Sequence, residues 1–165
     1  MAKVLLDKND IYVAASTATI LGSTGAETVK VKDGVEVTVD NSVERIEFAR
    51  ASSAYTYKTS STGMQVLYDN KIVANVAGGQ KLVFTDGSAS VAIGAFDLTT
   101  LTAQITLGGK IVTTTATKIT PSLNTASGEI STITLQPVAA SINPADTEQP
   151  ALALIGVNTP VADFI

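Results

Sequence analysis

Apolar residues occupy every second position along one stretch near the start of the chain. Between residues 29 and 39 the odd positions are mostly Val, while the even positions carry mainly Lys, Glu and Thr. A period of two places alternate side chains on opposite faces of a β-strand. Asp33-Gly34 interrupts the run and is typical of a turn or a bulge. The stretch therefore predicts strands with one buried and one solvent-facing side.

Short apolar runs continue along the chain, separated by residues that favour turns. These turn signals lie at residues 60–63, 69–70, 86–87 and 108–109. Turns spaced about 8–12 residues apart are typical of sandwiches, barrels and rolls. We expect an all-β fold, an antiparallel β-sandwich or β-roll-like domain with an extended C-terminal tail. One short helix is expected near residues 95–101, and further strands over 111–119 and 130–138.

The charge is distributed unevenly and indicates two parts. Lys118 is the last basic residue, and the acidic residues beyond it are Glu129, Asp146, Glu148 and Asp163. The net charge of -4 therefore lies after Lys118. We predict a β-rich domain over residues 1–120 and a tail over residues 121–165 that serves export, assembly or both. The tail's β-prone pieces could complete the domain's own sheet or pair with an edge strand of another subunit.

The composition narrows the possible functions. Only 16% of the residues are charged, against roughly 25% in typical domains, while 45% are hydrophobic. A hydroxyl-rich surface with few charges suits close contact between neighbouring molecules. A pI near 4.7 without a basic cluster argues against nucleic-acid binding. No stretch is long and apolar enough to insert into a membrane, and the N-terminus does not resemble a Sec signal.

Calcium is the candidate ligand. Residues 22–30 (GSTGAETVK) have the outline of the β-roll nonapeptide G-G-x-G-x-D-x-U-x, in which glycines form tight turns and a carboxylate ligates calcium. Ser23 replaces one Gly of that pattern, and Glu27 replaces the Asp. Acidic residues in turns could add oxygen ligands, although backbone geometry alone also favours Asp there. The candidate metal ligands are Glu27, Asp33, Asp40, Asp69 and Asp86.

Candidate catalytic groups are few. The chain has no His and no Cys, so the commonest general base and the thiolate nucleophile are both missing. Glu44 and Glu47 would lie on opposite faces of a strand, which argues against a paired-carboxylate hydrolase. We therefore expect that the protein is not an enzyme. Tyr55, Tyr57 and Tyr68 fit either an aromatic platform for sugars or cross-strand aromatic packing.

Several short phrases resemble one family. They are residues 37–48 (VTVDNSVERIEF), 55–57 (YTY), 65–69 (QVLYD) and 82–89 (LVFTDGSA). This set, covering about residues 19–110, resembles the β-rich C-terminal module of bacterial type I-secreted, RTX-associated surface proteins. The resemblance implies an uncleaved C-terminal signal, which residues 163–165 (DFI) fit, and a type I exporter as a partner. The chain differs by lacking the long RTX array and a large partner domain.

Together these features predict a secreted, extracellular or cell-surface structural protein that self-assembles into a filament, surface layer or biofilm matrix by strand exchange. Copies of itself are the expected partners, with residues 3–20 and 130–165 as candidate donors. Calcium could rigidify or bridge the subunits. The alternative is a monomeric calcium- or carbohydrate-binding adhesion module of the cell surface. The candidate assembly residues are Leu152, Leu154, Ile155, Val157, Phe164 and Ile165.

Overall fold

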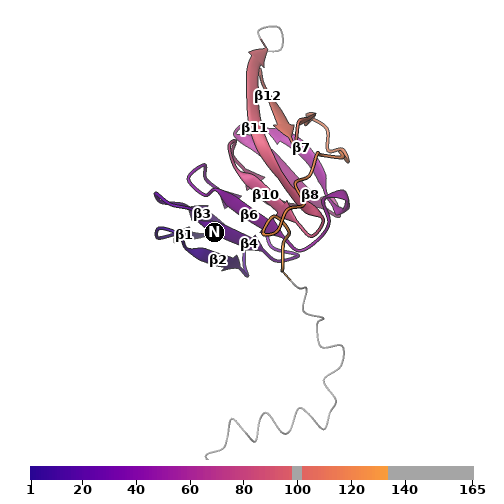
Figure 1. Ribbon diagram of the computed structural model, residues 1–165. Helices are drawn as coiled ribbons and strands as arrows, with labels where there is room; N and C mark the ends of the chain where they lie inside the picture. Colours follow the sequence, from indigo (N-terminus) through magenta and orange to yellow (C-terminus); the bar gives the residue numbers. More distant parts are fainter. Residues whose placement is uncertain (98–101, 134–165) are drawn as a thin grey trace, which may run out of the picture. The chain divides into compact units, whose positions relative to one another are not determined.

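The computed structural model describes residues 1–97 and 102–133, and the regular secondary structure of this part is almost entirely β-strand (Figure 1). Its one helical element is the short 3-10 helix η1 (Ser52–Ala54). The strands are β1 (Ala2–Leu5), β2 (Ile11–Ala14), β3 (Ala18–Leu21), β4 (Thr28–Val31), β5 (Val37–Val39), β6 (Arg45–Phe48), β7 (Thr56–Ser60), β8 (Gly63–Tyr68), β9 (Lys71–Val76), β10 (Lys81–Phe84), β11 (Gly87–Asp97), β12 (Thr102–Leu107) and β13 (Lys110–Ile111). The predicted all-β class is confirmed.

The first six strands alternate between two sheets. One sheet has the order β1-β3-β5-β9-β8-β7, and the other has the order β13-β12-β11-β10-β6-β4-β2. The chain therefore winds as a spiral, and we call each of its turns a coil. Each coil adds one strand to each sheet, and the next coil runs in the same direction. The pairs β1–β3, β3–β5 and β5–β9 are parallel, as are β2–β4, β4–β6 and β6–β10. Parallel pairing follows because the other sheet supplies the crossover that such pairs need.

The later strands form hairpins. β7, β8 and β9 pair antiparallel in one sheet, and β10, β11, β12 and β13 do so in the other. Asp69 and Asn70 have φ angles of 50° and 60°, the left-handed pair that a two-residue type I′ turn requires. The predicted antiparallel pairing therefore holds for these hairpins, whereas the first coils are parallel.

The hydrophobic core lies between the two sheets. Val29, Val31, Val37 and Val39 are all buried, so the alternation continues around the Asp33-Gly34 corner even though β4 and β5 belong to different sheets. Aromatic rings fill the part of the core near the hairpins. Phe48 stacks on Phe84 with ring centroids 5.4 Å apart, and Tyr55 lies 5.3 Å from Phe48. The Tyr57 hydroxyl donates to the Ser52 carbonyl at 2.8 Å.

Three local predictions are wrong within the described residues. β11 continues through Asp97, so no helix forms over residues 95–97; pairing with β12 holds this segment extended. In place of a strand over 111–119, β13 ends at Ile111, and Thr117 forms only an isolated bridge to Tyr57. Residues 130–133 are not a strand, and the rest of that prediction lies outside the described residues.

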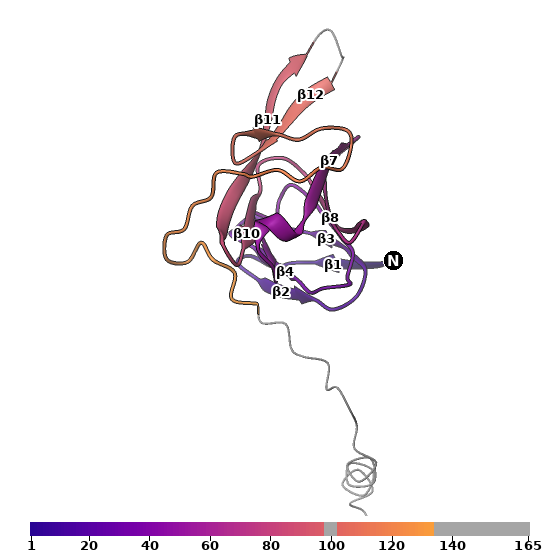
Figure 2. The same cartoon turned by 90° about the vertical axis from the view of Figure 1, so that its right-hand side faces the viewer.

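Residues 112–133, which we call the strap, hydrogen-bond to both sheets. Tyr57 and Thr117 exchange backbone hydrogen bonds of 2.9 and 3.1 Å, and Ser88 and Asn124 exchange bonds of 2.9 and 2.8 Å. The Ser131 N–H then donates to the Phe84 carbonyl at 2.8 Å. Figure 2 shows the strap, coloured orange, running across the sheets. The described start of the predicted tail, residues 121–133, thus contacts the β-rich domain.

Candidate assembly surfaces

Both sheets have an open edge at the first coil. β1 is hydrogen-bonded to β3 alone and β2 to β4 alone within the described part of the chain. The Leu6 N–H donates to the Leu21 carbonyl, so by strand alternation the N–H groups of Lys3 and Leu5 point away from β3. Leu5, Ile11 and Val13 are 74, 67 and 45% exposed. We call this surface, formed by the outer sides of β1 and β2, the open coil end.

The far edge of the first sheet is covered. β7 is its last strand, and the strap lies along its outer side. The Thr59 N–H donates to the Thr113 carbonyl at 2.9 Å, which adds a bond two residues along β7 from the Tyr57–Thr117 bridge. Unpaired strand edges are templates for pairing with other chains, and covering them prevents such contacts. The two ends of this sheet therefore differ in their capacity to accept another strand.

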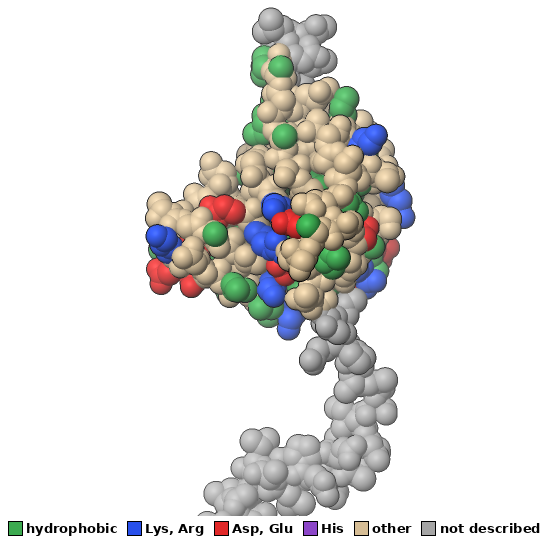
Figure 3. Space-filling view, viewed as in Figure 1, with side chains coloured by type: hydrophobic (Ala, Val, Ile, Leu, Met, Phe, Trp, Pro, Cys, Tyr) green, Lys and Arg blue, Asp and Glu red, His purple; other side chains and the backbone are tan. Residues whose placement is uncertain are grey.

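A groove of about 720 Å³ lies beside β12. Its apolar floor includes Ile93, Phe96 and Ile111, which are each more than half exposed. The β7–β8 turn and the start of the strap supply hydroxyl groups along its walls. Figure 3 shows hydrophobic side chains on the β11–β12 hairpin, which projects from the sheets. The groove is therefore apolar at its base and polar but uncharged at its rim.

Glu27 occupies a buried corner between successive coils. Its Oε1 accepts hydrogen bonds from the Ser23 hydroxyl at 2.7 Å and from the Asn9 N–H at 3.3 Å. Its Oε2 is buried and has no hydrogen-bond partner among the described residues. The Ser23 hydroxyl lowers the pKa of the Glu27 carboxyl below its ordinary value, against the opposing effect of burial. An unpartnered buried carboxylate oxygen is costly and fits a site where a cation would complete the coordination.

The other four candidate metal ligands have partners or lie apart. Asp40 accepts from the Gly22 and Ser42 N–H groups. Asp33 pairs with Arg50, whose Nε and terminal nitrogen lie 2.8 and 2.5 Å from Oδ2. Asp86 accepts both the N–H and the hydroxyl of Ser52 at 2.8 Å. Asp69 is in its hairpin turn. These carboxylates do not converge, and the described residues contain no group of three acidic side chains able to hold a metal.

The tyrosines belong mainly to the interior. Tyr55 and Tyr57 are buried, and burial raises the pKa of both hydroxyls. Tyr68 is half-buried, with its ring 5.9 Å from that of Tyr55 and the Arg50 guanidinium 4.3 Å from its centroid. These rings form packed aromatic contacts, and Tyr55 and Tyr57 present no platform to a sugar.

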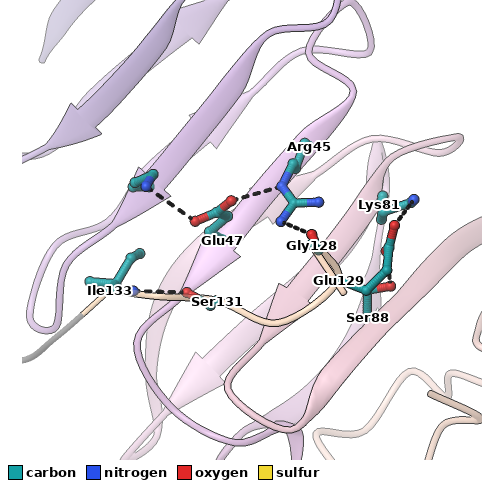
Figure 4. A network of polar contacts seen from close by, with 9 residues as sticks. Arg45, Glu47, Lys81, Ser88, Gly128, Glu129, Ser131 and Ile133 are labelled. Carbon is teal, nitrogen blue, oxygen red and sulfur yellow. Dashed lines mark hydrogen bonds and ion pairs between the residues drawn. The ribbon is translucent and has the colours of Figure 1, made fainter. Parts of the chain in front are cut away.

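A polar network, which the sequence did not reveal, fixes the end of the strap (Figure 4). Arg45 bonds Glu47 at 2.7 Å and donates to the Gly128 carbonyl at 2.8 Å. Glu129 pairs with Lys81 at 2.9 Å and accepts from the Ser88 hydroxyl. The Ser88 hydroxyl and then Lys81 lower the pKa of Glu129. The contacts of Arg45 with Gly128 and of Lys81 with Glu129 join residues far apart in sequence, so they can be identified only from the path of the strap in the structure.

Glu44 and Glu47 serve separate contacts. The Glu44 carboxylate accepts the Glu27 N–H, whereas Glu47 binds Arg45 and lies 3.6 Å from Lys30. The two therefore do not form a carboxylate pair. The predicted assembly residues Leu152, Leu154, Ile155, Val157, Phe164 and Ile165 lie outside the described residues.

Comparisons with known protein families, curated proteins and solved structures find no match to this chain. The resemblance to type I-secreted surface proteins therefore stays a prediction. Among the described residues, no helix has the length and apolar character required to cross a bilayer.

Proposed function

We propose that this protein is an extracellular structural protein whose copies assemble by exchanging or adding β-strands at exposed sheet edges. The open coil end carries the proposal. Two adjacent sheets terminate there without a neighbouring strand in the described part of the chain, and exposed apolar side chains accompany these edges. A strand from another copy would satisfy the free backbone groups and remove apolar surface from water.

The remaining features support a role in a polymer. The low charge of the chain offers little electrostatic repulsion between copies. Residues 3–20, which include most of β1 and all of β2, supply one contact, and residues 130–165 of the tail supply a second donor. The resemblance to type I-secreted proteins supports export by a type I exporter to a surface layer, filament or biofilm matrix. The role is structural, and no catalytic step is assigned.

Calcium is part of the proposal through Glu27. A cation at the unpartnered Oε2 would relieve the desolvation cost of that buried oxygen. Because Glu27 also contacts the preceding coil through Asn9, a bound ion would stiffen the first coils. The alternative function, a monomeric calcium- or carbohydrate-binding adhesion module, shares this corner but does not use the open edges.

A backbone substitution at the open coil end tests the proposal. Leu5→Pro removes an N–H that points away from β3, whereas Leu5→Ala removes the same side chain and retains the N–H. We expect electron microscopy and light scattering to detect ordered assemblies of the full-length protein. The Pro variant should form fewer or smaller assemblies than the wild type, and the Ala variant should retain a larger share. Circular dichroism should verify that both variants fold.

Two results would reject the proposal. One is a full-length protein that is monomeric both in calcium and in excess chelator, which would favour the adhesion module. The other is equal assembly by the folded Pro variant and the wild type, because edge pairing at β1 would then be unnecessary.

A further inference from the structure

The groove beside β12 contains an unpaired strand edge. β12 pairs with β11 along Thr102–Leu107, but it pairs with β13 only at Thr106 and Leu107. The Ile105 carbonyl accepts the Val112 N–H at 2.9 Å on the β13 side. By strand alternation, the N–H and carbonyl of Ala103 point to that same side. Within residues 1–97 and 102–133 no backbone partner meets them on that side, so β12 offers a place for an added strand.

The groove also selects for an uncharged occupant. Its lining comprises Thr, Ser, Gly, Ala, Gln and large apolar residues, without any charged side chain among the described residues. Ile93 and Phe96 are 59 and 54% exposed, although both are on β11 next to β12. A charged peptide would lose hydration here without gaining an ionic partner. An apolar segment would cover the floor while its backbone bonded to Ala103.

The chain itself contains a segment with these properties. Residues 151–157 (ALALIGV) are uncharged and apolar. The other candidate donor, residues 3–20, carries Lys3, Asp7, Lys8 and Asp10, so it matches the groove less well. In an extended conformation, Leu152 and Leu154 would fall on one face and could cover Ile93 and Phe96.

We propose that this groove accepts residues 151–157 of a second copy as a strand added beside β12. This inference rests on the proposed function and assigns its acceptor and donor. Residues 134–150, which join the strap to the donor segment, span at most about 60 Å when fully extended. That reach allows the segment to leave its own subunit and enter the groove of a neighbour.

Disulfide crosslinking can test the contact without interference because the chain has no native Cys. A tagged Ala103→Cys protein is mixed with an untagged Leu154→Cys protein under mild oxidation. Ala103 is on β12, directly next to the added strand, so a disulfide-linked heterodimer can form only when residues 103 and 154 of different copies meet. The matched control replaces Ala103→Cys by Asp69→Cys, an accessible site in the β8–β9 turn. A Thr113→Cys variant repeats the test from the groove's other wall.

We expect the Ala103→Cys and Thr113→Cys mixtures to give several-fold more heterodimer than the Asp69→Cys control. Heterodimer at the control level from both groove variants would overturn the inference. If assemblies sensitive to Leu5→Pro still formed in that case, the proposed function would stand and only the groove assignment would fail. Because Ala103 is exposed, we expect its substitution to leave thermal unfolding close to that of the wild type.

Discussion

The backbone N–H of Glu27 donates to the Glu44 carboxylate at 2.8 Å, although the residues are 17 positions apart in sequence. Two other hydrogen bonds also join residues 17 positions apart. The Asn9 side chain accepts the Ala26 N–H, and the Arg50 guanidinium donates to the Asp33 carboxylate. Each bond joins one coil to the next at a corner between the sheets. The polar corner residues therefore hold successive coils in register, while the Val-rich strands fill the core.

Gly22 tests how closely these corners pack. A Cβ at Gly22 would lie 2.6 Å from the backbone carbonyl of Ser42, so Gly22→Ala forces two coils apart. We expect a loss of about 1–3 kcal/mol in the free energy of unfolding, the usual cost of overpacking. Urea denaturation measures it.

Gly34→Asn is the matched control for that substitution. Gly34 has a φ of 77°, and a Cβ added there would meet no other atom within 4 Å. Asn tolerates this left-handed conformation, so we expect a smaller loss. Equal losses at the two glycines would contradict the close packing at Gly22.

Calcium binding at the Glu27 corner predicts a stability difference between two variants. Calcium should raise the thermal midpoint of the wild type, since a ligand that binds only the folded state stabilises it. Glu27→Gln should abolish this response, whereas Asp69→Asn, in a hairpin turn far along the chain, should keep it. Differential scanning calorimetry with added calcium and then chelator gives the measurement. A response that survives Glu27→Gln, or none in the wild type, would reject calcium at this corner.

The lowered pKa of Glu129 predicts an acid-sensitive strap. A carboxyl whose pKa is lower in the folded state than in the unfolded state stabilises the fold at neutral pH. That contribution falls away as the pH drops from the ordinary Glu value, about 4.3, through the lowered pKa. The wild type should therefore exceed Glu129→Gln in thermal midpoint at pH 7, and the difference should shrink as the pH falls through that window.

Ser88→Ala provides a second check on the strap because the Ser88 hydroxyl is the main cause of the lowered pKa of Glu129. The difference in thermal midpoint between the wild type and Ser88→Ala should also shrink as the pH falls. A midpoint difference between the wild type and Glu129→Gln that stays constant with pH would rule out this linkage.

Local sequence patterns predicted which side of a strand is buried, and where hairpin turns lie. They did not predict which strands pair with each other. The two-residue period correctly identified Val29, Val31, Val37 and Val39 as buried, and Asp69-Asn70 as a hairpin turn. However, alternation does not distinguish a corner between sheets from a turn within one. Asp33-Gly34 forms such a corner, so β4 and β5 are not paired with each other.

One sequence signal could have revealed the coil. Asp10, Glu27 and Glu44 recur at intervals of 17 residues, and Tyr12, Val29 and Ile46 repeat the spacing in register. A search for a fixed internal period detects such repeats. No repeat or spacing in the sequence indicated the polar network of the strap. Lys81 meets Glu129 only because the irregular chain of the strap brings Glu129 back to β10.

The open coil end and the groove beside β12 together determine how many neighbours each copy can join. Contact between two open coil ends uses the same surface on both partners, so it has two-fold symmetry and closes after two copies. The groove contact is head-to-tail, because donor and acceptor are different surfaces, and it can propagate. A copy making both contacts has three links: one symmetric partner, one donor and one acceptor. Such three-way connectivity generates a branched lattice, and it favours a sheet or matrix over an unbranched fibre.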